Sequence, residues 1–332
     1  MRVSLVYRDE LAAYDFGPAH PLRPERFTGA VALMRQHGLI GEGAMAVVEP
    51  QPAAEEDLLR VHDATYIAAV HEAGRDPRAF VPGHGIGPGD NPAFAGMHEA
   101  AALVCGAAVS AFQEVLEDRC DRALSLAGGL HHAHRDRAAG FCIYNDPAVG
   151  IAWALERYPD LRIASIDIDA HHADGVQEAF WDEPRVLTAS IHESGRYLFP
   201  GTGFADERGG PHAQGSALNI PLEPYTGDAE YRNAFDSTIA LAVRTFRPNL
   251  IVTQNGADAL ADDPLTSLGL TLSGYRDLVT RLAALSDELT GGRMVAFGGG
   301  GYAWREAVPR AWTILAMSLM ECAVPNELTA ER

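Results

Sequence analysis

Short apolar runs alternate along this chain with longer segments in which apolar and polar residues recur at helical spacing. The short runs are apolar at successive positions, which is typical of strands buried on both faces of a sheet. Eight such strands are predicted: Val3–Tyr7, Ala46–Val48, Ala123–Ala127, Ile163–Ile168, Val186–Ile191, Ala217–Ile220, Leu250–Thr253 and Met294–Phe297. This pattern indicates a sheet that is covered on both sides.

The longer segments predict the helices that would cover the sheet. One begins at Pro24 and ends near Gly38, which follows the preference for Pro in the first turn and Gly after the last. Further helices are predicted at 55–73, 95–118, 147–157, 174–182, 228–246, 273–290 and 303–321. This alternation of strands and helices favours an α/β fold, a mostly parallel sheet with helices on both faces.

The charge balance narrows the class of partner. Among 332 residues the chain has 26 basic and 45 acidic side chains, a net charge of −19, and every basic residue is Arg. Binding to a nucleic-acid backbone leaves a basic patch or stripe, so a nucleic-acid partner is not expected. A cationic partner suits this acidity, although solubility alone could explain it.

Cysteine usage and the N-terminal residues favour the cytoplasm. The four cysteines are scattered and form no CxxC pair: Cys105, Cys120, Cys142 and Cys322. A reduced compartment is therefore expected. Residues 1–10 become polar after six positions, unlike a signal peptide, and apolar stretches such as 100–112 are too short and Ala-rich to span a bilayer. We expect no membrane partner.

Five polar motifs follow the ends of predicted strands. They are GGLHHAHRD after 123–127, DIDAHHADG at the end of 163–168, SIHESG at the end of 186–191, NGAD after 250–253 and GGGGY after 294–297. Ligand sites in open α/β sheets lie beyond the carboxyl ends of the strands. Separate segments are therefore predicted to bring their chemical groups to one edge of the sheet.

Asp169 and His171 form the core of a predicted metal site. Residues two apart on an extended chain point the same way, so this carboxylate and imidazole share one direction. Catalytic zinc typically has three protein ligands and an open position, and Asp258 on the NGAD turn is the candidate third ligand. Zinc and ferrous iron both accept this donor set. Asp174 has a second interpretation, since it precedes a helix and could cap it.

The adjacent histidines His131 and His132 are candidates for proton transfer beside the metal. Their ordinary pKa lies near 6.5, and a base must be held in one tautomer by a group behind it. Asp167 and Asp174 are available, one for each imidazole. His134 continues the run without an assigned partner and is interpreted as a solvated side chain.

The glycine run Gly298–Gly301 lets the backbone approach a substrate closely, and Tyr302 after it is a phenolic donor suited to a developing oxyanion. A dinucleotide-binding loop is the competing interpretation, but it requires a helix directly after the glycines and an acid about 20 residues on. Phe141 and Phe199 could wall a narrow apolar channel or be core aromatics, and Cys142 is interpreted as a buried core thiol.

Taken together and in this order, the motifs resemble those of the histone deacetylase superfamily. The similarity runs from HPLRPER at 20–26 through GGLHHAHRDRAAGFCIYND, IDIDAHHADGVQEAF, GRYLFPGTG and NGAD to GGGGY. Within the superfamily the chain is most similar to the class I-like branch of bacterial acetoin-utilization deacetylases. The resemblance implies one deacetylase domain over residues 1–332 with an arginase-like α/β fold built on an eight-stranded parallel sheet.

The resemblance also implies a set of site residues. Zinc would be held by Asp169, His171 and Asp258. Asp167 and Asp174 would support His131 and His132, and Tyr302 would stabilise the transition state. Substrate would contact Asp90 at the rim, the tunnel lining of Gly140, Phe141, Phe199 and Leu265, and Gly300 in the glycine run. A structural K⁺ or Na⁺ would lie near Asp167, Asp169, His171, Ser190 and Ile191.

The implied activity is removal of acetyl groups from lysine side chains of a protein or peptide, with acetyl-CoA synthetase as a suggested target. A deacetylase of small cationic acetylpolyamines is an alternative that the charge of −19 would suit. A non-catalytic acyl-lysine binding protein is a further alternative, and a ureohydrolase of related fold is disfavoured because it needs two metals. The sequence leaves the oligomeric state open.

One position departs from the family pattern. Ala173, between His172 and Asp174, stands where many relatives have Gly. If the backbone there requires a positive φ, Ala would strain the loop that carries Asp174. The supporting role of Asp174 is therefore the part of the predicted site that depends most on local backbone geometry.

Overall fold

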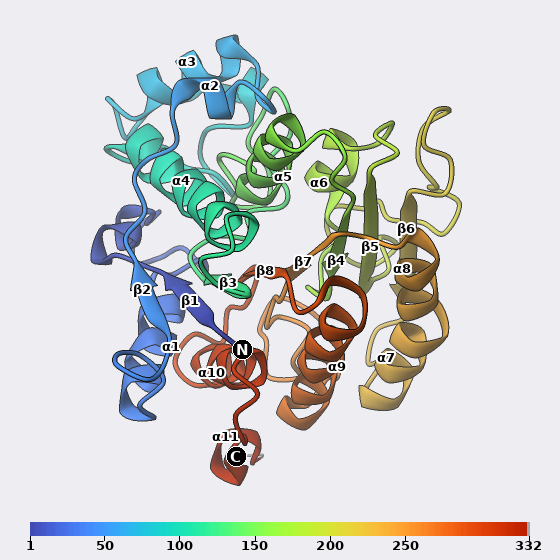
Figure 1. Ribbon diagram of the computed structural model, residues 1–332. Coiled ribbons are helices and arrows are strands. Elements are labelled where there is room, and N and C mark those ends of the chain that lie inside the picture. Colours follow the sequence, from blue (N-terminus) through green and yellow to red (C-terminus); the bar gives the residue numbers. More distant parts are fainter. Residues whose placement is uncertain (331–332) are drawn as a thin grey trace.

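A computed structural model describes residues 1–330 of the chain; the last two residues of the predicted domain 1–332 lie outside the described part. Eight strands form one sheet in the order β2-β1-β3-β8-β7-β4-β5-β6, and every neighbouring pair is parallel (Figure 1). The strands are β1 (Val3–Val6), β2 (Ala46–Val48), β3 (Arg122–Ser125), β4 (Ile163–Asp167), β5 (Val186–Glu193), β6 (Ala217–Leu222), β7 (Leu250–Gln254) and β8 (Met294–Phe297). The predicted eight-stranded parallel sheet is confirmed.

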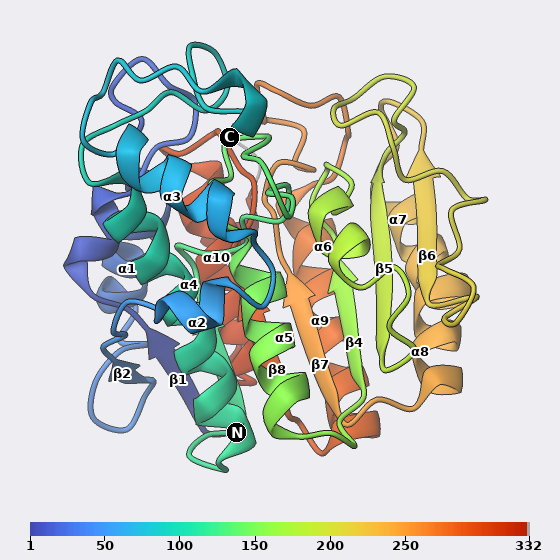
Figure 2. The ribbon, with the colours of Figure 1, turned by 90° about the horizontal axis from the view of Figure 1, so that it is seen from above.

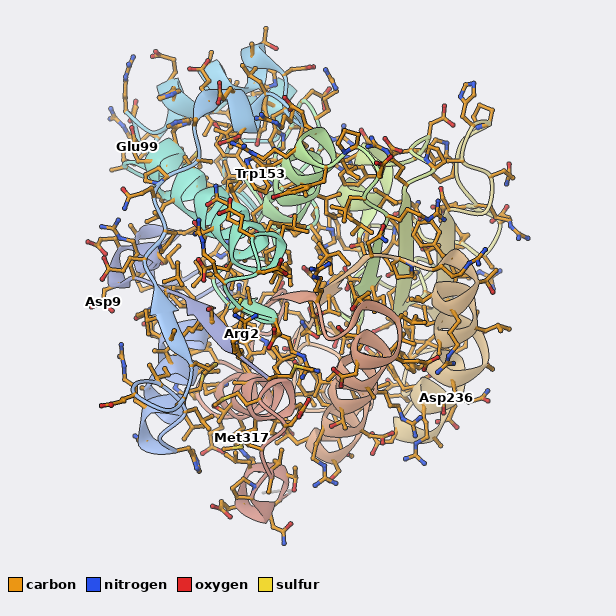
Figure 3. The ribbon with its side chains drawn as sticks, in the orientation of Figure 1. Arg2, Asp9, Glu99, Trp153, Asp236 and Met317 are labelled. Carbon is orange, nitrogen blue, oxygen red and sulfur yellow. The ribbon has the colours of Figure 1, made fainter. Side chains whose placement is uncertain are left out.

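Helices cover both faces of this sheet. They are α1 (Glu25–Gln36), α2 (Glu55–Leu58), α3 (Ala64–Ala73), α4 (Met97–Leu116), α5 (Asp146–Arg157), α6 (Asp174–Ala179), α7 (Asp228–Ala234), α8 (Ala240–Phe246), α9 (Leu272–Thr290), α10 (Ala307–Leu319) and α11 (Asn326–Thr329). Figure 1 shows α4, α5 and α6 on one side of the strands and α1, α9 and α10 on the other. Figure 3 shows side chains throughout the space between these layers, and Met317 of α10 is buried.

The apolar character of the strands follows from their place in the sheet. Strands β3, β7 and β8 lie inside the sheet and are buried at every residue. At one edge, β2 leaves Ala46 and Val47 exposed, because only one neighbour pairs with it. Central strands that are covered on both faces need apolar residues throughout, which is the pattern that the sequence displays.

Helix α4 corrects the prediction that no apolar segment is long enough to cross a membrane. It has 20 residues, and by length and composition alone it could span a bilayer. In the fold, 78% of its most apolar window is buried within the protein, where it packs against α5 and β3. Burial among other elements explains why this helix is rich in Ala and other apolar residues.

The predicted helix at 55–73 is wrong in one respect, because it is two helices, α2 and α3, with a break between them. Within the break, His62 turns inward and is 1% exposed. Its Nδ1 lies 2.9 Å from the His134 carbonyl oxygen, and its Nε2 accepts a 3.0 Å hydrogen bond from the Asn145 backbone N–H. The break therefore ties this segment to the loop after β3.

Smaller differences between the predicted and observed elements concern short helical segments. The predicted helix at 228–246 comprises α7 and α8 joined by a π-helical turn at Phe235–Ile239. Short 3-10 helices at Asp9–Ala13 and Pro82–His84, and the helix α11, have too few turns to show a helical period in the sequence. None of these differences changes the order of the elements.

All eight strands run in the same direction, so their carboxyl ends lie at one edge of the sheet, where the long loops gather (Figure 2). The turn after β7 is anchored there from the α9–α10 side. The Asn255 carbonyl oxygen accepts hydrogen bonds from Tyr275 of α9 at 2.9 Å and from Trp312 of α10 at 3.0 Å. This fixes the start of the turn that carries Asp258.

Candidate active site

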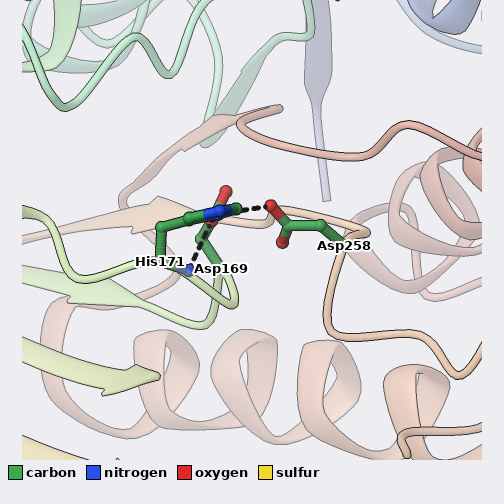
Figure 4. Close-up of side chains that lie close together, drawn as sticks. All are labelled: Asp169, His171 and Asp258. Carbon is green, nitrogen blue, oxygen red and sulfur yellow. Dashed lines mark hydrogen bonds and ion pairs between the residues drawn. The ribbon is translucent and has the colours of Figure 1, made fainter. Parts of the chain in front are cut away.

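Asp169, His171 and Asp258 converge beyond the ends of β4 and β7, which are neighbours in the sheet (Figure 4). His171 Nδ1 lies 2.9 Å from Asp258 Oδ2 and 3.1 Å from Asp169 Oδ1. The ligand atoms of all three residues lie within 4.8 Å of one another, and the side chains are buried. Within residues 1–330 no other group of three or more His, Cys, Asp or Glu side chains has this geometry.

This donor set fits a divalent cation. Two buried carboxylates side by side repel each other, and an ion between them would offset the cost of burying their charge. Backbone amides fix both groups: His171 N–H donates to Asp169 Oδ1 at 2.9 Å, and Ala170 N–H donates to Asp258 Oδ1 at 2.8 Å. Two carboxylate oxygens and one imidazole nitrogen form the three-ligand type of site that leaves a position open.

Gly300 closes over these carboxylates. Its N–H donates to Asp169 Oδ2 at 2.6 Å, and a Cβ at this position would collide with Asp258 Oδ2. A side chain here would therefore displace a candidate metal ligand. The glycine run provides close backbone approach, as the sequence predicted, and at Gly300 the approach is to the candidate metal ligands.

The tandem histidines each meet their predicted carboxylate. His131 Nδ1 lies 2.8 Å from Asp167 Oδ2, and His132 Nδ1 lies 2.7 Å from Asp174 Oδ1. The two Nε2 atoms face each other at 3.0 Å, which requires one of the imidazoles to donate and the other to accept. The ring of His132 packs edge-on against His171, with 5.6 Å between the ring centres.

The two imidazoles have opposite electrostatic environments. Burial lowers the pKa of His131, but the charges of Asp167 and Asp169 outweigh it and raise this pKa to about 9. Burial and the neighbouring charge of His131 lower the pKa of His132 to about 4. His131 is therefore suited to carry a positive charge, and His132 to be the neutral acceptor.

Asp174 holds His132 and also contacts the start of α6. It is the first residue of α6, and the residue before it, Ala173, has a φ of −76°, so the backbone needs no glycine there. The predicted strain at Ala173 is therefore absent. The Asp174 carboxylate accepts from His132 and, at 2.9 Å, from the Gly175 N–H in the first turn of α6, so it both holds His132 and satisfies a donor at the start of the helix.

Tyr302, like His132, packs edge-on against His171, with 6.4 Å between the ring centres of Tyr302 and His171. Its backbone N–H donates to Asp263 Oδ2 at 2.7 Å. Burial, together with the charges of Asp258 and Asp169, raises the pKa of the Tyr302 phenol well above its ordinary value. The phenol therefore stays protonated and is a hydrogen-bond donor.

Aromatic side chains wall the approach to this centre. The ring of Phe141 packs edge-on against Tyr302 at 5.8 Å, and that of Phe199 packs against His132 at 4.9 Å. Gly140 has a φ of +52°, and a Cβ there would lie 2.5 Å from the His132 ring and 2.8 Å from Phe199. Both phenylalanines therefore contact the site, and Phe141 also packs against the core. The predicted core thiol of Cys142 is buried beside them, lining the same pocket.

Asp90 and Leu265 lie farther out. His20 Nε2 lies 3.1 Å from the Asp90 carbonyl oxygen, and the His20 ring packs against Phe141. His20 therefore connects the Asp90 backbone to the aromatic wall of the site. Leu265 is 41% exposed, and its N–H donates to Asp263, the residue that also accepts from Tyr302.

Ser190 and Ile191, predicted near a monovalent cation, lie on β5 beside the end of β4. Ser190 pairs with Asp167 in the sheet register, and Ile191 is buried. The Ser190 hydroxyl lies 2.8 Å from His192 Nδ1. The predicted residues are therefore adjacent in the sheet.

His134 is not a solvated side chain, so this prediction is wrong. It is 7% exposed, with Nε2 3.3 Å from Asp174 Oδ2 and Nδ1 2.5 Å from Glu178 Oε2. These partners could not be predicted from local sequence, because Asp174 and Glu178 lie about 40 residues farther along the chain, at the start and near the end of α6.

Two further residues at the site were not predicted. Arg26 is buried, lines the same pocket, and donates to the Gly299 carbonyl oxygen. Asp263 joins the loop of Leu265 to Tyr302. Arg26 ends the HPLRPER motif, and its place in that motif could have identified it. Asp263 stands in an ordinary polar loop, and no pattern in the sequence marks it.

Comparisons with known proteins agree with this geometry. A model described as the histone deacetylase domain matches residues 20–319. The chain belongs to the histone deacetylase family. Acetoin utilization protein AcuC of Bacillus subtilis (strain 168) is 40% identical over 328 residues, covering 98% of this chain and 84% of the relative, and AcuC of Staphylococcus xylosus is 35% identical over 329 residues, covering 98% and 85%.

Solved structures of the family are similar in fold. A crystal structure of an HDAC homologue complexed with SAHA has a TM-score of 0.89 and 34% identity, and covers 98% of this chain and 86% of its own. An HDAC homologue from Aquifex aeolicus gives a TM-score of 0.88 at 34% identity, with the same coverage. The chain is thus a deacetylase of the acetoin-utilization branch, and its fold is that of this family of hydrolases.

Proposed function

We propose that the chain is a metal-dependent lysine deacetylase, which hydrolyses the amide of an acetylated lysine side chain and releases acetate. The observation that supports this most directly is the convergence of Asp169, His171 and Asp258 beside two carboxylate-backed histidines and Tyr302. Phe141 and Phe199 wall the approach, as an aliphatic acyl-lysine chain would require. We propose that residues 1–332 act as one deacetylase domain.

Each side chain has a role that its environment supports. Zinc or ferrous iron held by the three ligands would supply Lewis-acid polarisation of the carbonyl and activation of water. His132, neutral and oriented by Asp174, takes the proton of the attacking water and later delivers it to the leaving amine. His131 acts mainly through its charge and its hydrogen bond to His132. Tyr302 donates to the oxyanion.

The finer assignments extend this proposal. A K⁺ or Na⁺ beside Asp167, Asp169, His171, Ser190 and Ile191 would have a structural role. The partner would be an acetylated protein or peptide in the cytoplasm, with acetyl-CoA synthetase as a candidate, and neither nucleic acid nor membrane would take part. The acidic net charge of −19 supports a cationic substrate, and small acetylpolyamines are the second candidate class.

Acetate release from an acetyl-lysine peptide and from an acetylated polyamine, measured side by side on metal-loaded protein, tests the substrate class. We expect the peptide to have the higher kcat/KM by at least about tenfold, because a walled tunnel accommodates one extended side chain. A preference for the polyamine would assign the chain to the small-molecule alternative. Stoichiometric peptide binding without turnover would instead indicate a non-catalytic acyl-lysine binding protein.

Tyr302→Phe tests the oxyanion donor. The ring and its packing against Phe141 remain, so only the hydroxyl is lost. We expect kcat to fall by about 10²-fold, as for loss of one oxyanion donor, with KM within about twofold. Steady-state kinetics on the peptide separate the two parameters. A change in KM alone would contradict this role and assign the hydroxyl to ground-state binding.

A further inference from the structure

The Asp174 carboxylate faces two histidines, and the mechanism uses one of them. Its Oδ1 accepts from His132 Nδ1 at 2.7 Å, and its Oδ2 lies 3.3 Å from His134 Nε2. On the far side of its ring, His134 Nδ1 lies 2.5 Å from Glu178 Oε2. Four ionisable side chains are therefore linked in one chain, His132–Asp174–His134–Glu178, by hydrogen bonds at its two ends and by an ion pair between Asp174 and His134.

Hydrogen bonds hold the backbone of His134 in place between Asp174 and Glu178. Its backbone N–H donates to the Arg137 carbonyl at 2.9 Å, and its own carbonyl oxygen lies 2.9 Å from His62 Nδ1. Burial lowers the pKa of His134, but the hydrogen bonds and charges of Asp174 and Glu178 outweigh it and raise the pKa above its ordinary value. Both ring nitrogens then donate, one to each carboxylate.

The outer end of the chain opens into a side cavity. This cavity has a volume of about 620 Å³ and is lined by His134, Asp174, Glu178, Trp181 and Phe199 among others. The Glu178 side chain is 52% exposed, so it can be changed with little effect on the core. Phe199 borders this cavity and also packs on His132, so its side chain lies between the cavity and the candidate base.

We propose that His134, held by Glu178, is a positioning residue that fixes the Asp174 carboxylate and thereby the orientation of His132. Without a donor on Oδ2, only Oδ1 would hold the carboxylate, through His132 Nδ1 and the Gly175 N–H. A donor on Oδ2 sets the plane of the group, and Oδ1 then meets His132 Nδ1 in one geometry. This inference rests on the proposed deacetylase function for its kinetic test.

His134→Phe keeps a ring at this position and removes both N–H donors, whereas His134→Gln retains one amide donor. We expect His134→Phe to lower kcat on the acetyl-lysine peptide by about tenfold, with KM within about twofold, because outer hydrogen-bond partners typically contribute a factor of 10–100. His134→Gln should recover most of the loss. Equal losses in both variants, or a loss confined to KM, would overturn the positioning role.

Glu178→Ala provides a variant with little risk to folding, since its side chain is half exposed. We expect it to lower kcat as His134→Phe does, but by a smaller factor of about threefold. The matched control is His212→Phe, which breaks an exposed His–Asp pair with Asp182 that is not part of the four linked side chains. The control should leave kcat unchanged; an unchanged kcat in Glu178→Ala as well would exclude Glu178 from the chain.

A double-mutant cycle tests whether His134 acts through Asp174. In an Asp174→Asn background, His134→Phe should cause little further loss, because the link that it supports is already broken. Full additivity of the two losses would place His134 outside the chain and overturn the inference.

A spectroscopic measurement separates this inference from the proposed function. In protein with ¹⁵N-labelled imidazoles, the His132 Nδ1–H in its short bond to Asp174 gives a low-field proton signal, assigned through its loss in His132→Ala. We expect this signal to shift in His134→Phe and to stay in place in His212→Phe. If the wild type hydrolyses no acetyl-lysine substrate, the proposed function fails, and this signal still decides the positioning: an unmoved signal overturns it.

Discussion

Replacement of His132 by Ala is expected to reduce turnover by about 10³-fold or more while the metal remains bound. The imidazole is the neutral member of the tandem pair, Asp174 holds its Nδ1–H, and its ring packs against the candidate ligand His171, so its Nε2 is the base available at the site. General acid–base catalysis contributes about 10²–10⁴-fold, and here one residue serves both proton transfers. Single-turnover acetate release on metal-loaded protein measures the effect.

Two measurements make the His132→Ala result interpretable. Metal content by elemental analysis should match the wild type, since His132 is not among the three candidate ligands. Thermal unfolding should show whether the loss of a buried ring destabilises the fold. Metal lost along with activity would move His132 into the metal site, and intact turnover would remove it from the mechanism.

Removal of the metal is expected to have an effect of similar size. Chelation of the wild type, and Asp258→Ala, should each lower turnover by about 10³-fold or more, because the polarisation of the carbonyl and the activation of water are both lost. The wild type should bind about one divalent ion per chain, and zinc or ferrous iron should restore activity after chelation. A second divalent ion per chain would favour the two-metal chemistry of ureohydrolases.

Asp262→Ala is the matched control for Asp258→Ala. Asp262 lies four residues farther along the same loop and is exposed, and it is not one of the converging ligands. It should retain both the ion and the activity. A readout without turnover is the unfolding temperature, which should rise on metal addition in the wild type and not in Asp258→Ala, since only the wild type binds. Turnover that survives chelation would contradict the metal-dependent mechanism.

The sheet could be predicted because its signal is local. Strands β3, β7 and β8 are buried at every residue, so each needs a continuous apolar run, and such a run is visible in the sequence. The candidate metal ligands could be predicted for a related reason. Asp169 and His171 are two residues apart, and parallel strands deliver their carboxyl ends to one edge, where Asp258 also lies.

Other features depended on partners that are distant in sequence. The break between α2 and α3 exists because His62 bonds to Asn145, 83 residues away, and no local pattern marks that contact. The apolar helix α4 could not be assigned by composition, because the same residues suit a protein core and a bilayer. The length of such a run is local information, but its surroundings are not.

The sequence by itself determined the eight strands, the edge at which the polar motifs gather and the identity of the groups that meet there, since each follows from local periodicity or from a short motif. Only the tertiary structure decided that Ala173 is unstrained and that His134 is buried between Asp174 and Glu178. The physical reason is that charge and hydrogen bonding depend on distances in space, which are set by packing between elements rather than by spacing along the chain.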